Sequence, residues 1–174
     1  MWRRSPPTSA LPTTSSFVKS LSAAAGIALL AAPALGAQGP APLQGRELTA
    51  AATVVLARHT FWGSELGLAK HAGGQGRVAV TAAGGSYEHA LGVRCEATAQ
   101  FLLRPGERSG AGPYAGLGLA FVGGAGARGA SYLTALVGVE SAPAARAGWY
   151  GELGLGGGVR VAVGRRFRHF PPGW

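Results

Sequence analysis

The chain has no aspartate, only one cysteine and few charged residues of any kind. Charged residues make up 13% of its 174 residues, and Cys95 alone cannot form an internal disulfide. The 30 glycines lack the every-third spacing of a collagen helix. With 47% hydrophobic residues, the chain is too apolar for a disordered protein. These features exclude disulfide-stapled, collagen-like, coiled-coil and disordered classes, and they leave an apolar, glycine-rich domain.

The first 37 residues differ in composition from the rest of the chain. Three basic residues and no acidic ones lie in a stretch rich in Ser, Thr and Pro, and an apolar run follows at 21–32. This run is shorter than the roughly 20 residues that a helix needs to span a bilayer, and small residues at 34–37 offer a cleavage site after it. An N-terminal membrane anchor that stays attached is the alternative. We predict a cleaved signal peptide at 1–37, a short linker at 38–45 and a single folded domain at 46–174.

Positive charge remains when this leader is removed. Three of the sixteen basic residues and none of the seven glutamates lie in it, so the remaining part carries a net charge of +6. Nucleic-acid binding is disfavoured, because an exported chain seldom meets nucleic acid and the basic residues form no continuous stripe with interleaved aromatics. At predicted turns and strand ends lie Arg46, Arg58, Arg77, Arg104, Arg108, Arg128, Arg146, Arg165 and Arg166. These arginines either contact acidic lipid or lipopolysaccharide through paired hydrogen bonds to phosphate, or they are simply solvated.

From residue 46 onward the apolar residues recur at every second position, which is the period of a β-strand. At 114–122, for example, Leu117, Leu119 and Phe121 alternate with glycine or alanine. Glycine-rich turns separate such runs, and consecutive hairpins of this kind form an antiparallel meander. Two ambiguities remain, because the first run could be a helix and 149–168 could be one long strand. Eight strands are predicted, at 47–58, 61–71, 76–84, 88–103, 112–122, 130–141, 148–156 and 158–168.

The polarity of the two strand faces distinguishes a soluble sheet from a membrane barrel. In a soluble sandwich the second face would be rich in Lys, Glu, Asp and Thr, but here it consists mostly of Gly, Ala and Thr with a few Glu and Arg. Such a face fits a narrow lumen, whereas the aliphatic face suits lipid. About 137 residues over eight strands give roughly 17 per strand and turn, against the 9–11 needed to cross a bilayer. We therefore predict an all-β fold, an antiparallel up-and-down transmembrane β-barrel of eight strands.

Two sets of side chains follow from this barrel. The interior of an eight-stranded barrel is only wide enough to be filled by side chains, so charges inside must pair, and a lumen plug is favoured over an ion-selective pore. The proposed lumen charge network is Glu65, Arg94, Glu96, Glu140, Glu152 and Arg160. Aromatic residues near strand ends are typical of interfacial girdles, although each one singly could also be ordinary packing. The proposed interfacial aromatics are Trp62, Tyr87, Tyr114, Tyr132, Trp149, Tyr150, Phe167 and Phe170.

Two alternating, glycine-rich segments, YAGLGLAFVGG at 114–124 and GELGLGGGVRVAVGRRF at 151–167, follow the export signal. In these features the chain resembles the small outer-membrane β-barrel proteins of Gram-negative-type bacteria. The resemblance implies an outer-membrane location and recognition by the outer-membrane assembly machinery, whose signal is a glycine followed three and five residues later by aromatics. Gly164 and Phe167 match the first part of this signal, but His169 stands at the second aromatic site. If both termini face the periplasm, the outer loops are short, unlike those of adhesins in this group.

No catalytic constellation stands out in the sequence. The four histidines, His59, His71, His89 and His169, show no metal-ligand spacing, and the glycine clusters lack the Lys-Ser/Thr of a phosphate-binding loop. We therefore expect no enzymatic role, no metal and no cofactor, but a structural or lipid-contacting outer-membrane component with a plugged polar lumen. Two alternatives stay open. One is a soluble periplasmic β-barrel that binds an apolar ligand inside; the other is a lipid-modifying outer-membrane enzyme, which requires a serine and a histidine to meet at one barrel edge.

Overall fold

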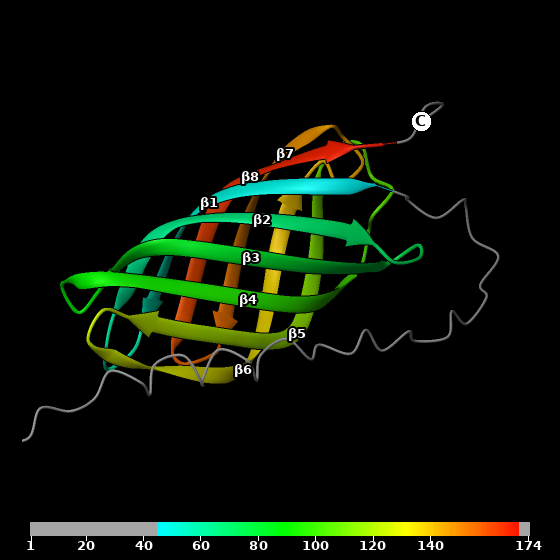
Figure 1. Ribbon diagram of the computed structural model, residues 1–174. Helices are drawn as coiled ribbons and strands as arrows, with labels where there is room; N and C mark the ends of the chain where they lie inside the picture. The colour runs from blue at the N-terminus through cyan, green and yellow to red at the C-terminus, as the bar shows by residue number, and fades with distance from the viewer. Residues whose placement is uncertain (1–44, 171–174) are drawn as a thin grey trace, which may run out of the picture. The chain divides into compact units, whose positions relative to one another are not determined.

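Eight antiparallel strands close into a barrel in the computed structural model, which describes residues 45–170 (Figure 1). The strands are β1 (Arg46–Leu56), β2 (Phe61–His71), β3 (Gly76–Tyr87), β4 (Ala90–Leu102), β5 (Ala111–Gly124), β6 (Ala127–Ser141), β7 (Ala147–Leu155) and β8 (Val159–His169). Each strand pairs with the next along the chain, and β8 pairs with β1 to close the ring. The all-β, eight-stranded antiparallel fold predicted from the sequence is therefore confirmed. The predicted signal peptide lies outside the described residues.

The predicted strands correspond one to one with the observed strands, and both ambiguities of the sequence are resolved. The first run is a strand, as its Thr and Val residues at 53–55 favour. A turn at 156–158 separates β7 from β8, where Gly157 and Gly158 have positive φ values of 74° and 146°. Glycine adopts these angles without steric cost, so the chain can reverse here within three residues. Among residues 45–170 there is no helix with the length and apolar character needed to span a membrane.

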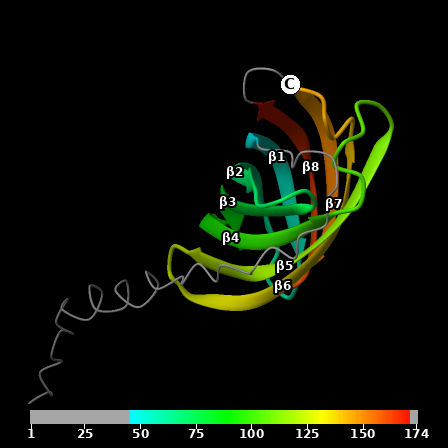
Figure 2. The same cartoon turned by 90° about the vertical axis from the view of Figure 1, so that its right-hand side faces the viewer.

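Short connections join the strands at both ends of the barrel, and Figure 2 shows β1 to β8 following one another around its wall. We call the end that carries residues 45 and 170 the terminal end, and the opposite end the distal end. At the distal end the turns are 57–60, 88–89, 125–126 and 156–158; at the terminal end they are 72–75, 103–110 and 142–146. Glu88 and His89 have φ values of 50° and 67°, the left-handed conformation of a two-residue type I′ hairpin. The longest connection thus lies at the terminal end.

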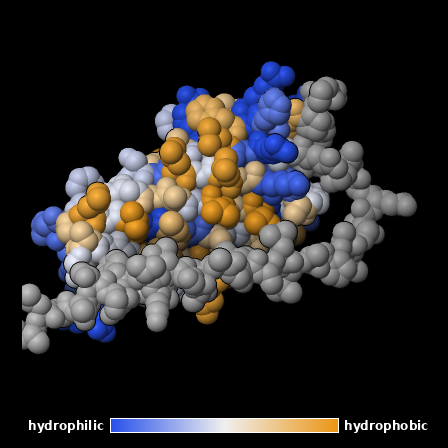
Figure 3. Space-filling model, viewed as in Figure 1, coloured by the Kyte–Doolittle hydropathy of each residue, from blue (hydrophilic) through white to orange (hydrophobic). Residues whose placement is uncertain are grey.

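Polar side chains point into the barrel and aliphatic side chains point out of it. On β8, Arg160 and Ala162 are buried, whereas Val161 and Val163 are 41% and 56% exposed. Figure 3 shows hydrophobic side chains over the middle of one face of the barrel and hydrophilic ones toward both ends. We call the exposed side chains Leu48, Leu66, Leu68, Val80, Val93, Leu117, Leu119, Leu133, Val137, Leu153, Val161 and Val163 the aliphatic belt. The soluble alternative placed the aliphatic faces inside the barrel, and that expectation is wrong.

Six of the eight proposed interfacial aromatics are exposed or half-buried. Trp62 is 61% exposed, Trp149 59%, Phe167 44% and Tyr132 37%. Tyr87 and Phe170 are half-buried at strand ends, and Tyr87 packs against apolar side chains inside the distal end of the barrel. The rings of Trp62, Trp149 and Phe167 lie on the outer surface near the two ends. Tyr132 lies on the inward-facing register of β6, opposite the buried Ala120, so its assignment and that of Tyr87 to the interface are wrong.

The other two, Tyr114 and Tyr150, lie inside the barrel, at 2% and 4% exposure, so their assignment to the interface is wrong. Tyr150 follows the outward Trp149 on β7, and successive side chains of a strand point to opposite faces. Tyr114 pairs in register with Gly138 on β6. A Cβ atom at Gly138 would lie only 2.4 Å from the Tyr114 ring, so the glycine provides the space that this ring occupies.

The apolar side chains inside the barrel form two small clusters. Val55, Phe61 and Ala83 pack together near the distal end, with the half-buried Tyr87 against them. Leu102 and Leu136 pack against Tyr114 in the second cluster. Most of the remaining interior is polar, and its charged side chains form the candidate site.

Candidate functional site

Charged side chains of both signs fill the interior of the barrel. Five glutamates and five arginines are buried there, together with His71: Glu47, Glu65, Glu96, Glu140, Glu152, Arg77, Arg94, Arg160, Arg166 and Arg168, all at most 8% exposed. The glutamate and arginine charges balance. Because a buried charge is tolerated only when it is paired and hydrogen-bonded, the partners of these side chains determine what the interior can do.

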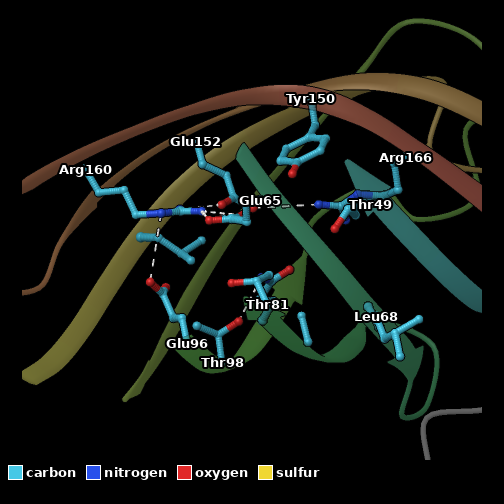
Figure 4. A pocket seen from close by; sticks show the side chains of 14 residues that line it. Thr49, Glu65, Leu68, Thr81, Glu96, Thr98, Tyr150, Glu152, Arg160 and Arg166 are labelled. Atoms are coloured by element: carbon cyan, nitrogen blue, oxygen red, sulfur yellow. Dashed lines mark hydrogen bonds and ion pairs between the residues drawn. The ribbon is translucent and has the colours of Figure 1, made fainter. Parts of the chain in front are cut away.

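The first of two groups surrounds Arg160 (Figure 4). We call Glu65, Arg94, Glu96, Glu152 and Arg160 the Arg160 cluster. The guanidinium of Arg160 donates through Nη2 to both oxygens of Glu65, at 2.7 and 2.8 Å, and through Nη1 to Glu152 Oε2 at 2.7 Å. Its Nε lies 3.9 Å from Glu96 Oε2, which accepts a 2.7 Å hydrogen bond from Arg94 Nη2. Four strands, β2, β4, β7 and β8, therefore meet across the lumen through Arg160.

The second group lies toward the terminal end and surrounds two carboxylates. We call Glu47, His71, Arg77, Glu140, Arg166 and Arg168 the Glu47 cluster. Glu47 Oε1 contacts His71 Nε2 at 2.8 Å and accepts from Arg168 Nε at 3.1 Å. Its Oε2 accepts from Nη1 of both Arg77 and Arg166, at 3.2 Å. One carboxylate on β1 thus joins β2, β3 and β8.

Glu140 on β6 pairs with the same three arginines from the other side. Its Oε2 lies 2.9 to 3.0 Å from a guanidinium nitrogen of each. Aromatic faces complete this arrangement, since Arg77 lies 4.7 Å from the ring centre of Tyr114 and Arg166 lies 4.6 Å from that of Tyr150. A cation over an aromatic face is stabilised by the ring quadrupole, so the two inward tyrosines act as partners of the arginines.

The two clusters are unbalanced in opposite directions and contact each other. The Arg160 cluster holds three glutamates and two arginines, and the Glu47 cluster holds two glutamates, three arginines and His71. Arg166 Nη2 lies 3.7 Å from Glu152 Oε1, and the Tyr114 hydroxyl donates to that same oxygen at 2.8 Å. A continuous polar network therefore runs along the lumen, with excess negative charge toward the distal side and excess positive charge toward the terminal side.

Little free space remains between these side chains. A cavity of about 20 Å³ is lined by Glu65, Glu96, Arg160 and Arg166, among others, and lies between the two clusters (Figure 4). A cavity needs roughly 10–15 Å³ to hold one water molecule. This space therefore has room for about one water and not for a column of water or for an organic solute.

Solved structures with a similar fold are bacterial outer-membrane proteins. The N-terminal β-barrel domain of OprF from Pseudomonas aeruginosa matches with a TM-score of 0.58 at 14% identity, over 73% of this chain and 98% of that domain. The outer-membrane protein OprG from the same species matches with a TM-score of 0.57 at 11% identity, over 78% of this chain and all of OprG. Neisserial surface protein A matches with a TM-score of 0.53 at 15% identity, over 74% of this chain and 99% of that protein.

This chain has the fold of a small outer-membrane β-barrel. No protein-family model matches it, and no curated protein matches it in sequence. At these low identities the similarity concerns the barrel itself, so the properties of the interior have to be argued from its own residues.

The outer-membrane-type barrel brings together the residues that the sequence proposed for the lumen. Five of the six form the Arg160 cluster, and Glu140 lies in the Glu47 cluster. Sequence reasoning missed Glu47, His71, Arg77, Tyr114, Arg166 and Arg168. Alternation provides a signal for two of these, because Arg166 and Arg168 lie an even number of residues from Arg160 on one strand and therefore share its face.

Arg77 and Arg166 were expected at the rim, and the structure corrects this expectation. They are 1% and 3% exposed, since both lie on inward positions of strands whose polar face continues to the terminal end. The other seven arginines expected at turns and strand ends are exposed: Arg46, Arg58, Arg104, Arg108, Arg128, Arg146 and Arg165. Only these seven are available to contact lipid or solvent.

The serine and histidine that lipid-modifying chemistry would require do not meet in the described part of this barrel. Ser141 accepts a 2.8 Å hydrogen bond from the Trp149 amide, while His71 contacts Glu47. No hydrogen bond between residues 45 and 170 joins a serine to a histidine, and no group of three or more metal-ligating side chains is found there.

Replacing Glu96 by leucine is expected to destabilise the barrel by about 1.5–3 kcal/mol, the range for a hydrogen bond to a charged group. The change leaves Arg94 Nη2 without its carboxylate, although Arg94 Nη1 still donates to the Gly156 carbonyl. Urea-induced unfolding in detergent, followed by gel migration with and without boiling, measures the loss. Glu107→Leu is the matched control, because its ion pair with Arg104 lies on the surface, where such pairs contribute little. Equal resistance of Glu96→Leu and the parent protein to heat would contradict the proposed network.

Proposed function

We propose that this chain is a bacterial outer-membrane β-barrel protein that serves as a structural or lipid-contacting membrane component, without enzymatic activity. The observation that carries the proposal is the inversion of polarity between the two surfaces of the barrel. Large aliphatic side chains such as Leu66, Leu68 and Leu133 are 64%, 68% and 83% exposed, while ten Glu and Arg side chains are buried. Water would favour the opposite arrangement, whereas a bilayer favours this one.

The dimensions of the barrel support embedding. Its strands contain 9 to 15 residues, and a tilted strand needs about 9–11 to cross the hydrocarbon core. All backbone groups of such a wall must pair within the protein, which the closed ring of strands provides. Trp62 near the distal end and Trp149 and Phe167 near the terminal end would lie at the two membrane interfaces.

The proposed lumen is a plug. The Arg160 and Glu47 clusters join opposite walls of the barrel, and the cavity between them has room for about one water molecule. On the distal side Val55, Phe61 and Ala83 add an apolar layer. We propose that the charges stabilise and order the barrel interior and that no solute passes through it.

Assembly would use the last strand. Phe167 and His169 point outward on β8, and Gly164 points inward, so the glycine and the aromatic residue of the proposed assembly signal lie on opposite faces of the strand. An outward Phe167 is accessible to the outer-membrane assembly machinery, which the proposal names as a partner. Membrane lipid is the other partner.

Membrane fractionation tests the proposal directly. We expect the expressed protein in the outer-membrane fraction and, after detergent extraction, faster gel migration without boiling than with boiling, because the closed barrel resists the detergent until it is heated. Recovery in the soluble fraction would overturn the proposal. In planar bilayers the inserted protein should give no stepwise conductance, and regular conductance steps would show that the lumen is open rather than plugged.

A further inference from the structure

We infer that the outer surface of β8, β1 and β2 at the terminal end binds the headgroup of an anionic glycerophospholipid. This inference rests on the proposed embedding in the outer membrane and adds to it a defined lipid site. We call Arg46, Lys70, Arg165 and His169 the basic patch. All four side chains point outward and are exposed, so none of them belongs to the lumen network.

The first observation is the register of three basic residues in one row. Arg46 lies directly opposite Lys70 on β2 and directly opposite His169 on β8. Like charges opposite each other on one sheet face are unfavourable. Among residues 45–170, the ion pairs on the outer surface are His59 with Glu88 and Arg104 with Glu107, so no described carboxylate compensates this row. An anion that bridges Arg46 and Lys70 would remove the repulsion.

The second observation is the position of Arg165 on the apolar surface. It lies four residues inside His169 on β8, next to Ala50 on β1 and Trp149 on β7. Its guanidinium lies 5.3 Å from the Trp149 ring centre and 5.7 Å from that of Phe167, which is closer to the terminal end. A cation on a lipid-facing strand is costly unless it extends toward the headgroups. Arg165 therefore points to the membrane interface at the height where the two aromatic rings lie.

The third observation is the unequal charge of the two barrel ends. Outside the lumen the terminal end carries Arg46, Lys70, Arg104, Arg108, Arg146 and Arg165 against Glu107. The distal end carries Arg58 and Arg128 against Glu88. Juxtamembrane Lys and Arg residues are attracted to anionic lipid, each by a similar amount, so the terminal end is the stronger site for such lipid.

The charge difference also indicates which leaflet supplies the lipid. A chain that inserts from the periplasm must move one end of the barrel across the hydrocarbon core, and moving charges across it is costly. The distal end carries fewer charges than the terminal end, so it crosses the hydrocarbon core at lower cost. The basic patch then stays in the periplasmic leaflet, which consists of glycerophospholipid, whereas lipopolysaccharide occupies the other leaflet.

Tryptophan quenching by brominated lipid tests this site on the full chain. The variant Trp2→Phe/Trp62→Phe/Trp174→Phe keeps only Trp149, beside the basic patch. It is inserted into phosphatidylcholine vesicles that contain acyl-brominated phosphatidylglycerol or, at the same mole fraction, acyl-brominated phosphatidylcholine. We expect about 2- to 5-fold greater quenching by the anionic lipid, because basic residues concentrate it locally. The variant Trp2→Phe/Trp149→Phe/Trp174→Phe, with Trp62 near the distal end, should be quenched nearly equally by both.

A matched pair of charge variants locates the effect. In the single-Trp149 protein, Arg46→Gln/Lys70→Gln should lower the excess quenching, and Arg58→Gln/Arg128→Gln, which removes the same charge at the distal end, should leave it unchanged. Equal quenching by both lipids in a heat-modifiable, inserted barrel would overturn the inference and leave the proposed function intact. Loss of the excess quenching on adding lipopolysaccharide would assign the basic patch to that lipid and would also overturn the inference. No quenching by either lipid would mean that the chain is not embedded, and both proposals would then fail.

Discussion

Replacing Arg160 by methionine should destabilise the barrel by about 3–5 kcal/mol, the cost of breaking a buried ion pair by removing one partner. Arg160 donates to Glu65 and Glu152 and lies near Glu96, so its loss leaves three buried carboxylates with Arg94 as the nearest remaining cation of their cluster. Methionine fills much of the same volume, so the change tests charge more than packing. This is the largest single effect expected within the Arg160 cluster, because no other side chain of that cluster contacts three partners of opposite sign.

Urea titration of the barrel in detergent, with gel migration of unboiled samples as the measure of folding, gives the free energy of unfolding. The control Arg58→Met removes an exposed arginine at the distal end. It should change the free energy of unfolding by less than about 0.5 kcal/mol. Arg160→Met/Glu65→Gln should be more stable than Arg160→Met, since it removes one of the uncompensated carboxylates. If Arg160→Met unfolds at the same urea concentration as the parent protein, Arg160 contributes nothing to the order of the lumen.

The strands of this barrel could be predicted from the sequence because their pattern is local. The alternation of valine with arginine or glycine along 159–164 is visible without any partner strand, and the glycine clusters mark the turns. The order of the strands also follows, because each short turn forces the next strand to pair with the previous one. The observed β1 to β8 are therefore close to the predicted strands in both number and position.

The orientation of single side chains near strand ends was harder to predict, for a physical reason. Arg77 and Arg166 are close to turns in sequence, and residues near turns are usually solvated. Both point inward because carboxylates on other strands compensate them at the terminal end: Glu140 lies 63 residues from Arg77, and Glu47 lies 119 residues from Arg166. Pairing over such separations is set by the closure of the ring and not by local pattern.

Aromatic residues were misplaced for a related reason. A tyrosine near a strand end suits a membrane interface, but it also suits a lumen that offers space and cations. Gly138 supplies the space for Tyr114, and Arg77 and Arg166 supply the cations. The period of the strand would have indicated that Tyr150 and Trp149 point to opposite faces, so the error came from grouping them by position along the chain rather than by parity.

Because polar and aliphatic side chains lie on opposite faces of the strands, one substitution on the outer surface can test what that surface contacts. The expected loss of stability is large if the surface contacts lipid and small if it contacts water. Leu66→Arg should destabilise the folded barrel in vesicles by about 2–4 kcal/mol, the cost of arginine at the midplane of a bilayer on the lipid face of a barrel. Leu66 is 64% exposed and lies on β2 midway between Trp62 and Lys70, which places it near the centre of the aliphatic belt. On a surface that meets water, the same exposed leucine could be replaced with an effect within about 0.5 kcal/mol.

Leu91→Arg is the matched control, since this leucine is even more exposed, at 74%, but lies beside the 88–89 turn at the distal end. Arginine close to the interface costs only about 0–1 kcal/mol, because its side chain can reach the headgroups. Urea unfolding from vesicles of one lipid composition compares the two variants with the parent barrel. A large loss of stability for Leu66→Arg together with a small loss for Leu91→Arg would mean that the cost of arginine depends on its depth in a bilayer. A surface in contact with water shows no such dependence. Two small and equal losses would mean that the aliphatic belt is not in contact with lipid, and the embedding of the barrel would have to be abandoned.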